Sequence, residues 1–230
     1  MIPLKDNNPT ARFPLITIII IFLNVIIFVY KDLLGFGGEA AVIRFGLIPY
    51  NIVTAGQMTS SGPILAGSTL ISSQFLHAGF FHLAGNMLFL WIFGNNIEDR
   101  LGSTRFALFY LACGVIAGAS QIIPDPQSRI PMIGASGAVA GVMGAYLLEY
   151  PRARILTLIW VLFFIRLIWL PSFIILLYWV ALQIFFQFSG GGGVGGVAYM
   201  AHIGGFAGGL VLFKIFTLFE WKRRLRRKEN

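Results

Sequence analysis

The sequence predicts an all-α membrane protein, a bundle of six transmembrane helices with an interfacial loop between the first two. Of its 230 residues, 57% are hydrophobic and only 11% are charged, a composition far from that of soluble globular proteins. Several apolar runs approach about 20 residues, the helical length that crosses a hydrocarbon core of about 30 Å. No stretch between them is long enough for a soluble domain, so we expect a single membrane domain over residues 1–230.

The apolar runs set the expected spans in order. They cover residues 14–30, 79–97, 104–121, 136–150, 171–188 and 200–219. The first run follows a short segment, residues 1–13. It is long for a signal peptide and no convincing small-residue cleavage site follows it, so we expect it to be retained. The last run leads into a basic tail, residues 220–230.

The lysines and arginines predict which side of the membrane each end occupies. With residues 1–13 in the cytoplasm, only Lys31, Arg44 and Arg129 of the 17 cationic residues fall on the outer side. Cytoplasmic loops are rich in Lys and Arg, so we expect a multi-pass protein of the plasma (inner) membrane with both termini cytoplasmic. The basic tail directly follows a span, which favours a membrane anchor over a nucleic-acid site. We expect no nucleic-acid partner.

Two further segments do not fit plain spans. Residues 31–78 mix apolar and polar side chains and are too long for a tight turn, which indicates an outer loop lying in the membrane interface. Residues 154–170 are apolar but contain Arg166 and are followed by Pro171. A seventh span here would reverse the orientation of the tail, so we expect an interfacial segment on the cytoplasmic side.

The fourth span is short, and a serine begins it. Ser136 to Tyr150 is 15 residues, or about 22 Å of helix against a core of about 30 Å. The preceding loop must then dip below the outer surface, where irregular backbone is tolerated only inside protein or beside a wet cavity. We therefore expect Ser136 at the floor of a water-filled hollow that opens to the outer side.

A histidine near the start of the sixth span lies at a similar depth. His202 and Ser136 both stand where their helices enter from the outer side, and glycine pairs four residues apart follow each of them. Such pairs let helix backbones approach closely, with or without chemistry. Here they would draw the two side chains together, which predicts a nucleophile, Ser136, and a general base, His202. No third acid is apparent, so we expect a Ser–His dyad.

The second span carries two polar side chains at membrane depth. His82 and Asn86 are four residues apart and so lie on one helical face. They form either an interhelical hydrogen bond that holds the bundle together or a pair of donors aimed at a developing oxyanion. The backbone N–H of Ser136, at a helix N-terminus, would be a third donor. We expect the oxyanion role.

Metal chemistry is the rival reading of the histidines. His77, His82 and His202 would together offer three imidazoles to a metal ion. The sequence contains no H-E-x-x-H motif, and no carboxylate in the spans is placed to act as a base. A G-x-S-x-G elbow is excluded as well, because Ala138 occupies its last position. We expect no metal and no cofactor.

Five motifs follow one another on these spans in an informative order. They are His77 with His82-x-x-x-Asn86, Gly94 with Glu98-Asp99-Arg100-Leu101-Gly102, Gly134-Ala135-Ser136-Gly137, Pro151-Arg152-Ala153-Arg154, and Ala201-His202-Ile203-Gly204-Gly205. Each is weak alone, but the set resembles the rhomboid intramembrane serine proteases in their basic six-span bacterial form. The likeness extends from about Phe45 to about Lys214.

The resemblance implies an endopeptidase that cleaves single-span membrane proteins in or beside their transmembrane helix, within the lipid bilayer and on its outer side. It implies Ser136 as nucleophile, His202 as base, and His82 and Asn86 as oxyanion stabilisers. His77, Gly134 and Gly137 would support them. The outer loop before the second span and the fifth span are implied to control lateral access of the substrate, and residues 189–196 to form a flexible cap.

One position departs from the family pattern. Four residues after the serine the family often carries an aromatic ring that stacks on the catalytic histidine, and this chain has Ala140 there. We expect another ring, such as Phe206 or Tyr199, to orient His202 instead.

Two other functions stay open. A non-catalytic rhomboid-like protein that binds membrane clients without cutting them would be favoured if the serine or histidine were missing, and neither is. A small-solute transporter would be favoured by an inverted repeat or a pair of broken helices, and the sequence shows neither. The physiological substrate and the oligomeric state are left undetermined by the sequence.

Overall fold

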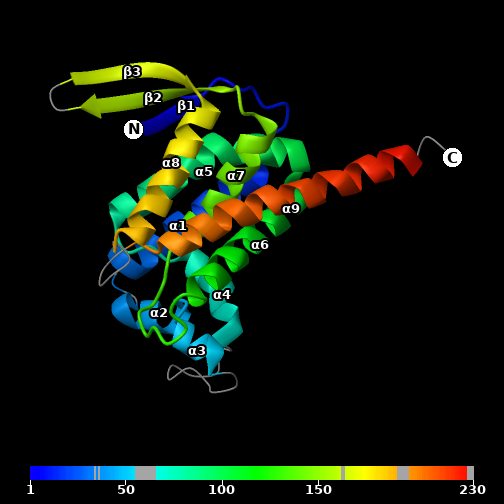
Figure 1. Cartoon of the computed structure of the whole chain (residues 1–230). Coiled ribbons are helices and arrows are strands. Elements are labelled where there is room, and N and C mark those ends of the chain that lie inside the picture. The colour runs from blue at the N-terminus through cyan, green and yellow to red at the C-terminus, as the bar shows by residue number, and fades with distance from the viewer. Residues whose placement is uncertain (34, 36, 55–65, 162–163, 191–196, 227–230) are drawn as a thin grey trace.

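The computed structural model describes residues 1–33, 35, 37–54, 66–161, 164–190 and 197–226. Its long helices form the predicted bundle, seen in Figure 1. Each expected span coincides with a helix: α1 (Leu15–Phe28), α5 (Phe80–Leu101), α6 (Ser103–Ile122), α7 (Ser136–Glu149), α8 (Ser172–Phe188) and α9 (Tyr199–Arg226). The chain is therefore a helical, multi-pass membrane protein.

The helices differ in whether they are long and apolar enough to cross a bilayer. Residues Leu15–Leu33, Ser103–Ile122 and Tyr199–Leu218 are long and apolar enough to cross alone. Helix α5 meets the test only together with the short helices at Ala66–Phe75, from which it is bent by 85°. Helix α7 has 14 residues and α8 has 17, so crossing by these two, and the count of six, stay predictions.

The segment between α1 and α5 is built from short helical pieces rather than extended loop. They are a π-helical turn (Val29–Leu33), α2 (Gly38–Phe45), α3 (Pro49–Val53), a 3₁₀ turn (Ala66–Ser68), α4 (Thr69–Ser72) and a second 3₁₀ turn (Ser73–Phe75). Helices α2 and α3 lie at the end of the bundle opposite the N-terminus (Figure 1). One residue of this segment, Leu47, pairs with Met132 in the loop before α7.

A three-stranded antiparallel sheet at the other end is an addition that the sequence analysis did not foresee. Strands β2 (Arg154–Val161) and β3 (Phe164–Pro171) form a hairpin from the segment expected to lie in the interface. Strand β1 (Ile2–Asp6), from the N-terminal segment, pairs with β2, so the order is β1-β2-β3. The hairpin projects sideways from the bundle (Figure 1).

Carboxylates at the end of α5 fix the start of the chain to the bundle. Glu98 is 2% exposed and accepts hydrogen bonds from the backbone N–H of Ile16 and Thr17, and from the hydroxyls of Thr17 and Ser103. These are the orphan donors of the first turn of α1, so a side chain from α5 caps α1. The neighbouring Asp99 accepts from the backbone N–H of the two residues before Phe13.

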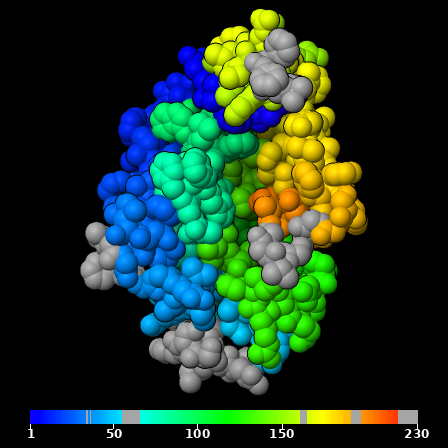
Figure 2. Space-filling view, turned by 90° about the vertical axis from the view of Figure 1, so that its left-hand side faces the viewer, coloured from blue at the N-terminus to red at the C-terminus, as the bar shows by residue number. Residues whose placement is uncertain are grey.

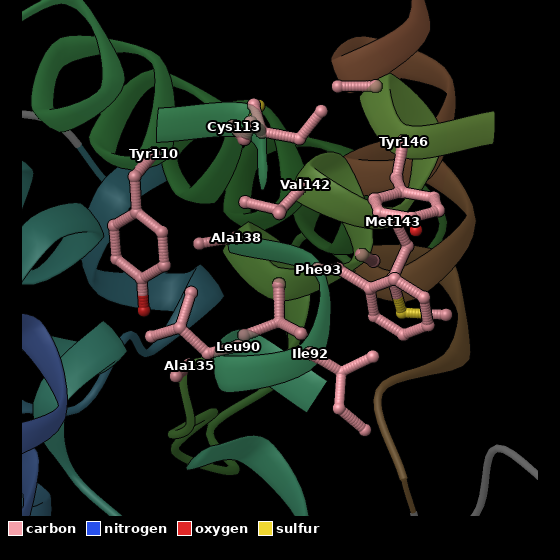
Figure 3. Packing of buried hydrophobic residues seen from close by; sticks show 14 of the residues in the cluster. Leu90, Ile92, Phe93, Tyr110, Cys113, Ala135, Ala138, Val142, Met143 and Tyr146 are labelled. Carbon is pink, nitrogen blue, oxygen red and sulfur yellow. The ribbon is translucent and has the colours of Figure 1, made fainter. Parts of the chain in front are cut away.

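The centre of the bundle is packed around α7. Small residues of α7, Ala138 and Val142 among them, lie between side chains of α5 and α6, as Figure 3 shows. On its other side α7 meets α9 backbone to backbone. A Cβ placed on Gly209 would lie 2.0 Å from the carbonyl oxygen of Gly141, and one on Gly205 would lie 2.1 Å from that of Gly137. No side chain separates the two helices at these glycines.

Candidate active site

Ser136 is the first residue of α7, and the loop before it is held at two points. Met132 exchanges backbone hydrogen bonds with Leu47, and the N–H of Gly134 donates to the carbonyl of Ser73 at 2.9 Å. Gly134 has φ +127°, a conformation that side chains rarely allow, so glycine is needed for this approach to the helix. The serine itself is partly exposed.

His202 lies in the first turn of α9, and its helix start is also tied to a neighbour. The side-chain oxygen of Gln121, on α6, accepts a hydrogen bond from the N–H of Ala201 at 3.1 Å. This caps one of the free donors of the α9 N-terminus. His202 is 8% exposed. Its Nε2 lies 2.7 Å from Oγ of Ser136, so the two predicted side chains meet.

The glycines explain why this distance is short. Gly137 follows Ser136 directly, and Gly205 lies three residues after His202. Because the carbonyl of Gly137 touches the position of a Cβ on Gly205, the two backbones are in contact beside the two side chains. The prediction that glycine faces would bring Ser136 and His202 together matches this geometry.

Helix α8 supplies two contacts to His202 that the sequence analysis missed. Oε1 of Gln183 lies 2.8 Å from Nδ1 of His202, and the ring of Trp179 lies 5.5 Å from the imidazole, centroid to centroid. A lone amide inside an apolar span was the available signal for Gln183, because polar groups at membrane depth point to function. Nothing in the sequence pattern identified its partner.

The rings expected to orient His202 lie elsewhere. Phe206 packs on Trp179 at 6.3 Å, and Tyr199 stacks on Phe186 at 5.7 Å. Neither ring is in contact with the imidazole among the described ring pairs, so the expectation for Phe206 and Tyr199 was wrong. The ring on His202 comes from α8, while Ala140 is fully buried in the core.

His82 lies beside Ser136, whereas Asn86 is linked to the site only through a hydrogen bond to the backbone of His82. Ring atoms of His82 lie 2.9 Å from where a Cβ on Gly134 would stand, and Oγ of Ser136 lies 3.7 Å from that point. The imidazole therefore packs against the Gly134 backbone beside Ser136. The side-chain amide of Asn86 donates to the carbonyl of His82 at 2.9 Å, a bond within α5 and not across the site.

His77 stands behind His82. The two rings meet edge to face at 5.0 Å, and neither ring nitrogen of His77, which is 1% exposed, has a hydrogen-bond partner within the described residues. Burial, together with the nearby His82 and Lys31, lowers the pKa of His77 to about 3. The ring is therefore neutral at ordinary pH. In the part of the chain that the structure describes, no three His, Cys, Asp or Glu side chains gather as metal ligands.

The surface around the start of α9 is recessed. Figure 2 shows a hollow between α5, in turquoise, and α8, in yellow, with the first residues of α9, in orange, beside it. Residues 191–196 of the expected cap lie outside the described residues. The arrangement offers a hydroxyl bonded to a buried imidazole, with a second imidazole beside it, at the end of the bundle away from the sheet. Such a pair can deprotonate a serine for attack on a carbonyl.

Comparison with known proteins gives the same family as the motifs. The chain is 32% identical over 112 residues to Rhomboid protein 1, mitochondrial, of Saccharomyces cerevisiae, covering 44% of this chain and 32% of that protein. It is 31% identical over 135 residues to Rhomboid protease GluP of Bacillus subtilis, covering 58% of this chain and 24% of that one. With the presenilin-associated rhomboid-like protein, mitochondrial, of Homo sapiens it shares 37% identity over 90 residues, 38% of this chain and 24% of the relative.

The chain thus spans about a quarter to a third of the length of these relatives. The family model described as Rhomboid domain matches residues 66–219, from the short helices before α5 to the apolar part of α9. This range includes all five motifs that carry the resemblance. The chain belongs to the rhomboid family.

Proposed function

We propose that this protein is an intramembrane serine endopeptidase that cleaves single-span membrane proteins in or near their transmembrane helix. The observation that carries the proposal is the 2.7 Å separation of Oγ of Ser136 and Nε2 of His202. Membership of a family whose relatives include a protein named as a rhomboid protease supports it. The single-span substrate class is carried over from the family resemblance.

In this mechanism His202 accepts the proton of Ser136 while Oγ attacks the scissile carbonyl. His202 then donates that proton to the leaving amine, and water hydrolyses the acyl-enzyme in the reverse sense. The negative charge on the carbonyl oxygen develops beside the N-terminus of α7, where the backbone N–H of Ser136 has no partner inside the helix. His82, packed on Gly134, is the side-chain donor of this oxyanion site, and Asn86 acts through its bond to the His82 carbonyl.

The supporting residues have distinct parts in the proposal. Gly134 allows His82 to approach, because a Cβ there would clash with the ring. Gly137 allows α6 and α9 to approach, since its Cβ would lie 2.4 Å from that of Ala117. His77 backs the ring of His82. Helices α5 and α8 border the hollow from which a substrate helix would enter (Figure 2).

The same proposal places the protein in a plasma (inner) membrane with its termini in the cytoplasm. The sheet, which contains the N-terminal strand, lies at one end of the bundle, and the short helices α2 and α3 lie at the other (Figure 1). Only Lys31, Arg44 and Arg129 were expected outside, and all three belong to the segments at the α2 and α3 end or to the loop before α7. The active site then opens to the outer side.

The test is cleavage of a model single-span substrate in proteoliposomes. Ser136→Ala and His202→Ala should each abolish cleavage, whereas Ser120→Ala is the matched control, since within the described residues the hydroxyl of Ser120 donates to the carbonyl of Ile116 in its own helix. Labelling by a serine-directed mechanism-based inhibitor should require Ser136. Cleavage by folded Ser136→Ala protein would refute the mechanism, and an unlabelled, uncleaving wild type that still captures substrate would indicate the non-catalytic binder.

A further inference from the structure

The imidazole of His202 is held on two sides, and only one of them is the serine. Its Nε2 faces Ser136 at 2.7 Å and its Nδ1 faces Oε1 of Gln183 at 2.8 Å. A neutral imidazole has one protonated and one unprotonated nitrogen, so the partner of Nδ1 decides which tautomer is present. Whether Gln183 presents a hydrogen-bond donor or an acceptor to Nδ1 therefore decides whether the Nε2 that faces Ser136 is protonated.

The orientation of the Gln183 amide is fixed by a third contact. Its Nε2 donates to the carbonyl of Trp179 at 3.2 Å, one turn earlier in α8. A carbonyl oxygen can only accept, so the nitrogen of the amide must point along the helix and the oxygen must point at His202. Because an amide oxygen also only accepts, Nδ1 of His202 must carry the proton. Its Nε2 then has the lone pair that receives the proton of Ser136.

Gln183 and Trp179 of α8 together contact the imidazole of His202. They are four residues apart and so share a helical face, and both reach the same imidazole. Gln183 is 8% exposed, and the other buried residues of α8 are Ser172, Ile175 and Leu176, nearer the helix start. A polar side chain buried at membrane depth is costly unless it is bonded. Both ends of this one are bonded.

We propose that Gln183 is the third member of the catalytic arrangement, a positioning residue that holds His202 in the tautomer and orientation of a general base. This rests on the proposed function and deepens it, because it replaces the dyad with a Ser136–His202–Gln183 chain. In soluble serine proteases a carboxylate holds the histidine in the correct tautomer and orientation. Here a neutral amide has that role, without placing a second charge in the membrane. The side chain does not touch the substrate or the reacting atoms.

The test is the tautomer of His202, read by ¹⁵N magnetic resonance on histidine-labelled protein in lipid bilayers. Wild type should show His202 as a single neutral tautomer with the proton on Nδ1. Gln183→Leu removes the acceptor and should move the proton to Nε2 in part or in full. Gln183→Glu retains the acceptor oxygen and should keep the proton on Nδ1. The matched control is Gln187→Leu, one turn later in α8, which should leave the spectrum unchanged.

The kinetic arm uses the same variants in proteoliposomes. Gln183→Leu should lower kcat for a single-span substrate about tenfold with KM unchanged, as expected for loss of one orienting hydrogen bond. An unchanged His202 tautomer in folded Gln183→Leu protein would overturn the proposal. If the wild type neither cleaves nor reacts with a serine-directed inhibitor, the proposed function fails, while the tautomer measurement still decides the role of Gln183.

Discussion

A single methyl group between α7 and α9 should separate the catalytic pair. Gly205→Ala places a Cβ 2.1 Å from the carbonyl oxygen of Gly137, whereas ordinary van der Waals contact begins at about 3.4 Å. The obstacle is backbone and cannot rotate away, so the helices must part by roughly 1 Å. Ser136 precedes Gly137, and His202 lies one turn before Gly205. The shift should therefore lengthen the 2.7 Å contact between Oγ of Ser136 and Nε2 of His202.

The magnitude follows from the sensitivity of catalysis to position. A displacement of about 1 Å at the reacting groups costs on the order of 10² in rate. Overpacking of this kind also costs about 1–3 kcal/mol in stability, against which alanine regains about 1 kcal/mol of helix propensity. Gly205→Ala should thus fold, with a lowered melting temperature, and should cleave substrate about 100-fold more slowly than wild type.

The assay compares three Gly→Ala variants for substrate cleavage and for thermal unfolding in the same detergent. A Cβ on Gly208 meets the side chain of Ile116 at 2.7 Å, and not backbone of a neighbouring helix, and one on Gly85 meets nothing within 4 Å. The loss of activity should therefore rank Gly205→Ala above Gly208→Ala, with Gly85→Ala near wild type. If Gly205→Ala retains wild-type cleavage, backbone contact between α7 and α9 does not set the catalytic distance.

Three further predictions concern other parts of the molecule. Glu98→Gln should destabilise the fold by about 2–4 kcal/mol in chemical or thermal unfolding, because an amide has one acceptor oxygen for the four donors that the carboxylate now satisfies. Glu39→Gln, at an exposed position of α2, is the surface control. The pKa of His77 is about 3 when folded and about 6.5 when unfolded. Between these two pKa values the unfolded state binds a proton on His77 that the folded state does not. The free energy of unfolding should therefore fall by about 2 kcal/mol from pH 6.5 to pH 5. His77→Leu should remove that pH dependence, and a wild-type melting temperature as high at pH 5 as at pH 7 would contradict it. Trp179→Ala should reduce the rate of serine-directed labelling at Ser136 by several-fold, since it strips the ring from His202; full-rate labelling would show that the ring does not orient the imidazole.

The helices were predictable because their signal is local. Apolar run length and the breaks between runs place α1, α5, α6, α7 and α8 within a few residues of their observed ends, and the start of α9 likewise, whereas α9 continues to Arg226, seven residues past its expected end. The hairpin of β2 and β3 was not predictable in the same way, because an apolar segment such as residues 154–170 satisfies its backbone either as a helix or by pairing. Its third strand, β1, is about 150 residues away in sequence, and no periodicity links two such segments.

In the candidate site, too, the residues with a local signal were predictable and the residue placed by helix packing was not. Ser136, His202 and His82 were predictable because each stands at or near a helix start, and helix starts on one side of a membrane share a depth. Gln183 lies deep in α8, and whether it faces His202 depends on the rotation of α8 about its own axis. That rotation is set by packing against α9, which sequence spacing does not reveal.

Two kinds of contact build the site, and they should respond differently to substitution. The distance between Ser136 and His202 is set by backbone contacts of α7 and α9, where the two helices meet with no side chain between them. The orientation of His202 is set by side chains of α8, a helix with much of its surface exposed. Substitutions such as Gly205→Ala should therefore lower melting temperature and rate together, while Gln183→Leu should lower the rate with little change in melting temperature. Equal ratios of the two effects in both sets would show that distance and orientation are not separately determined.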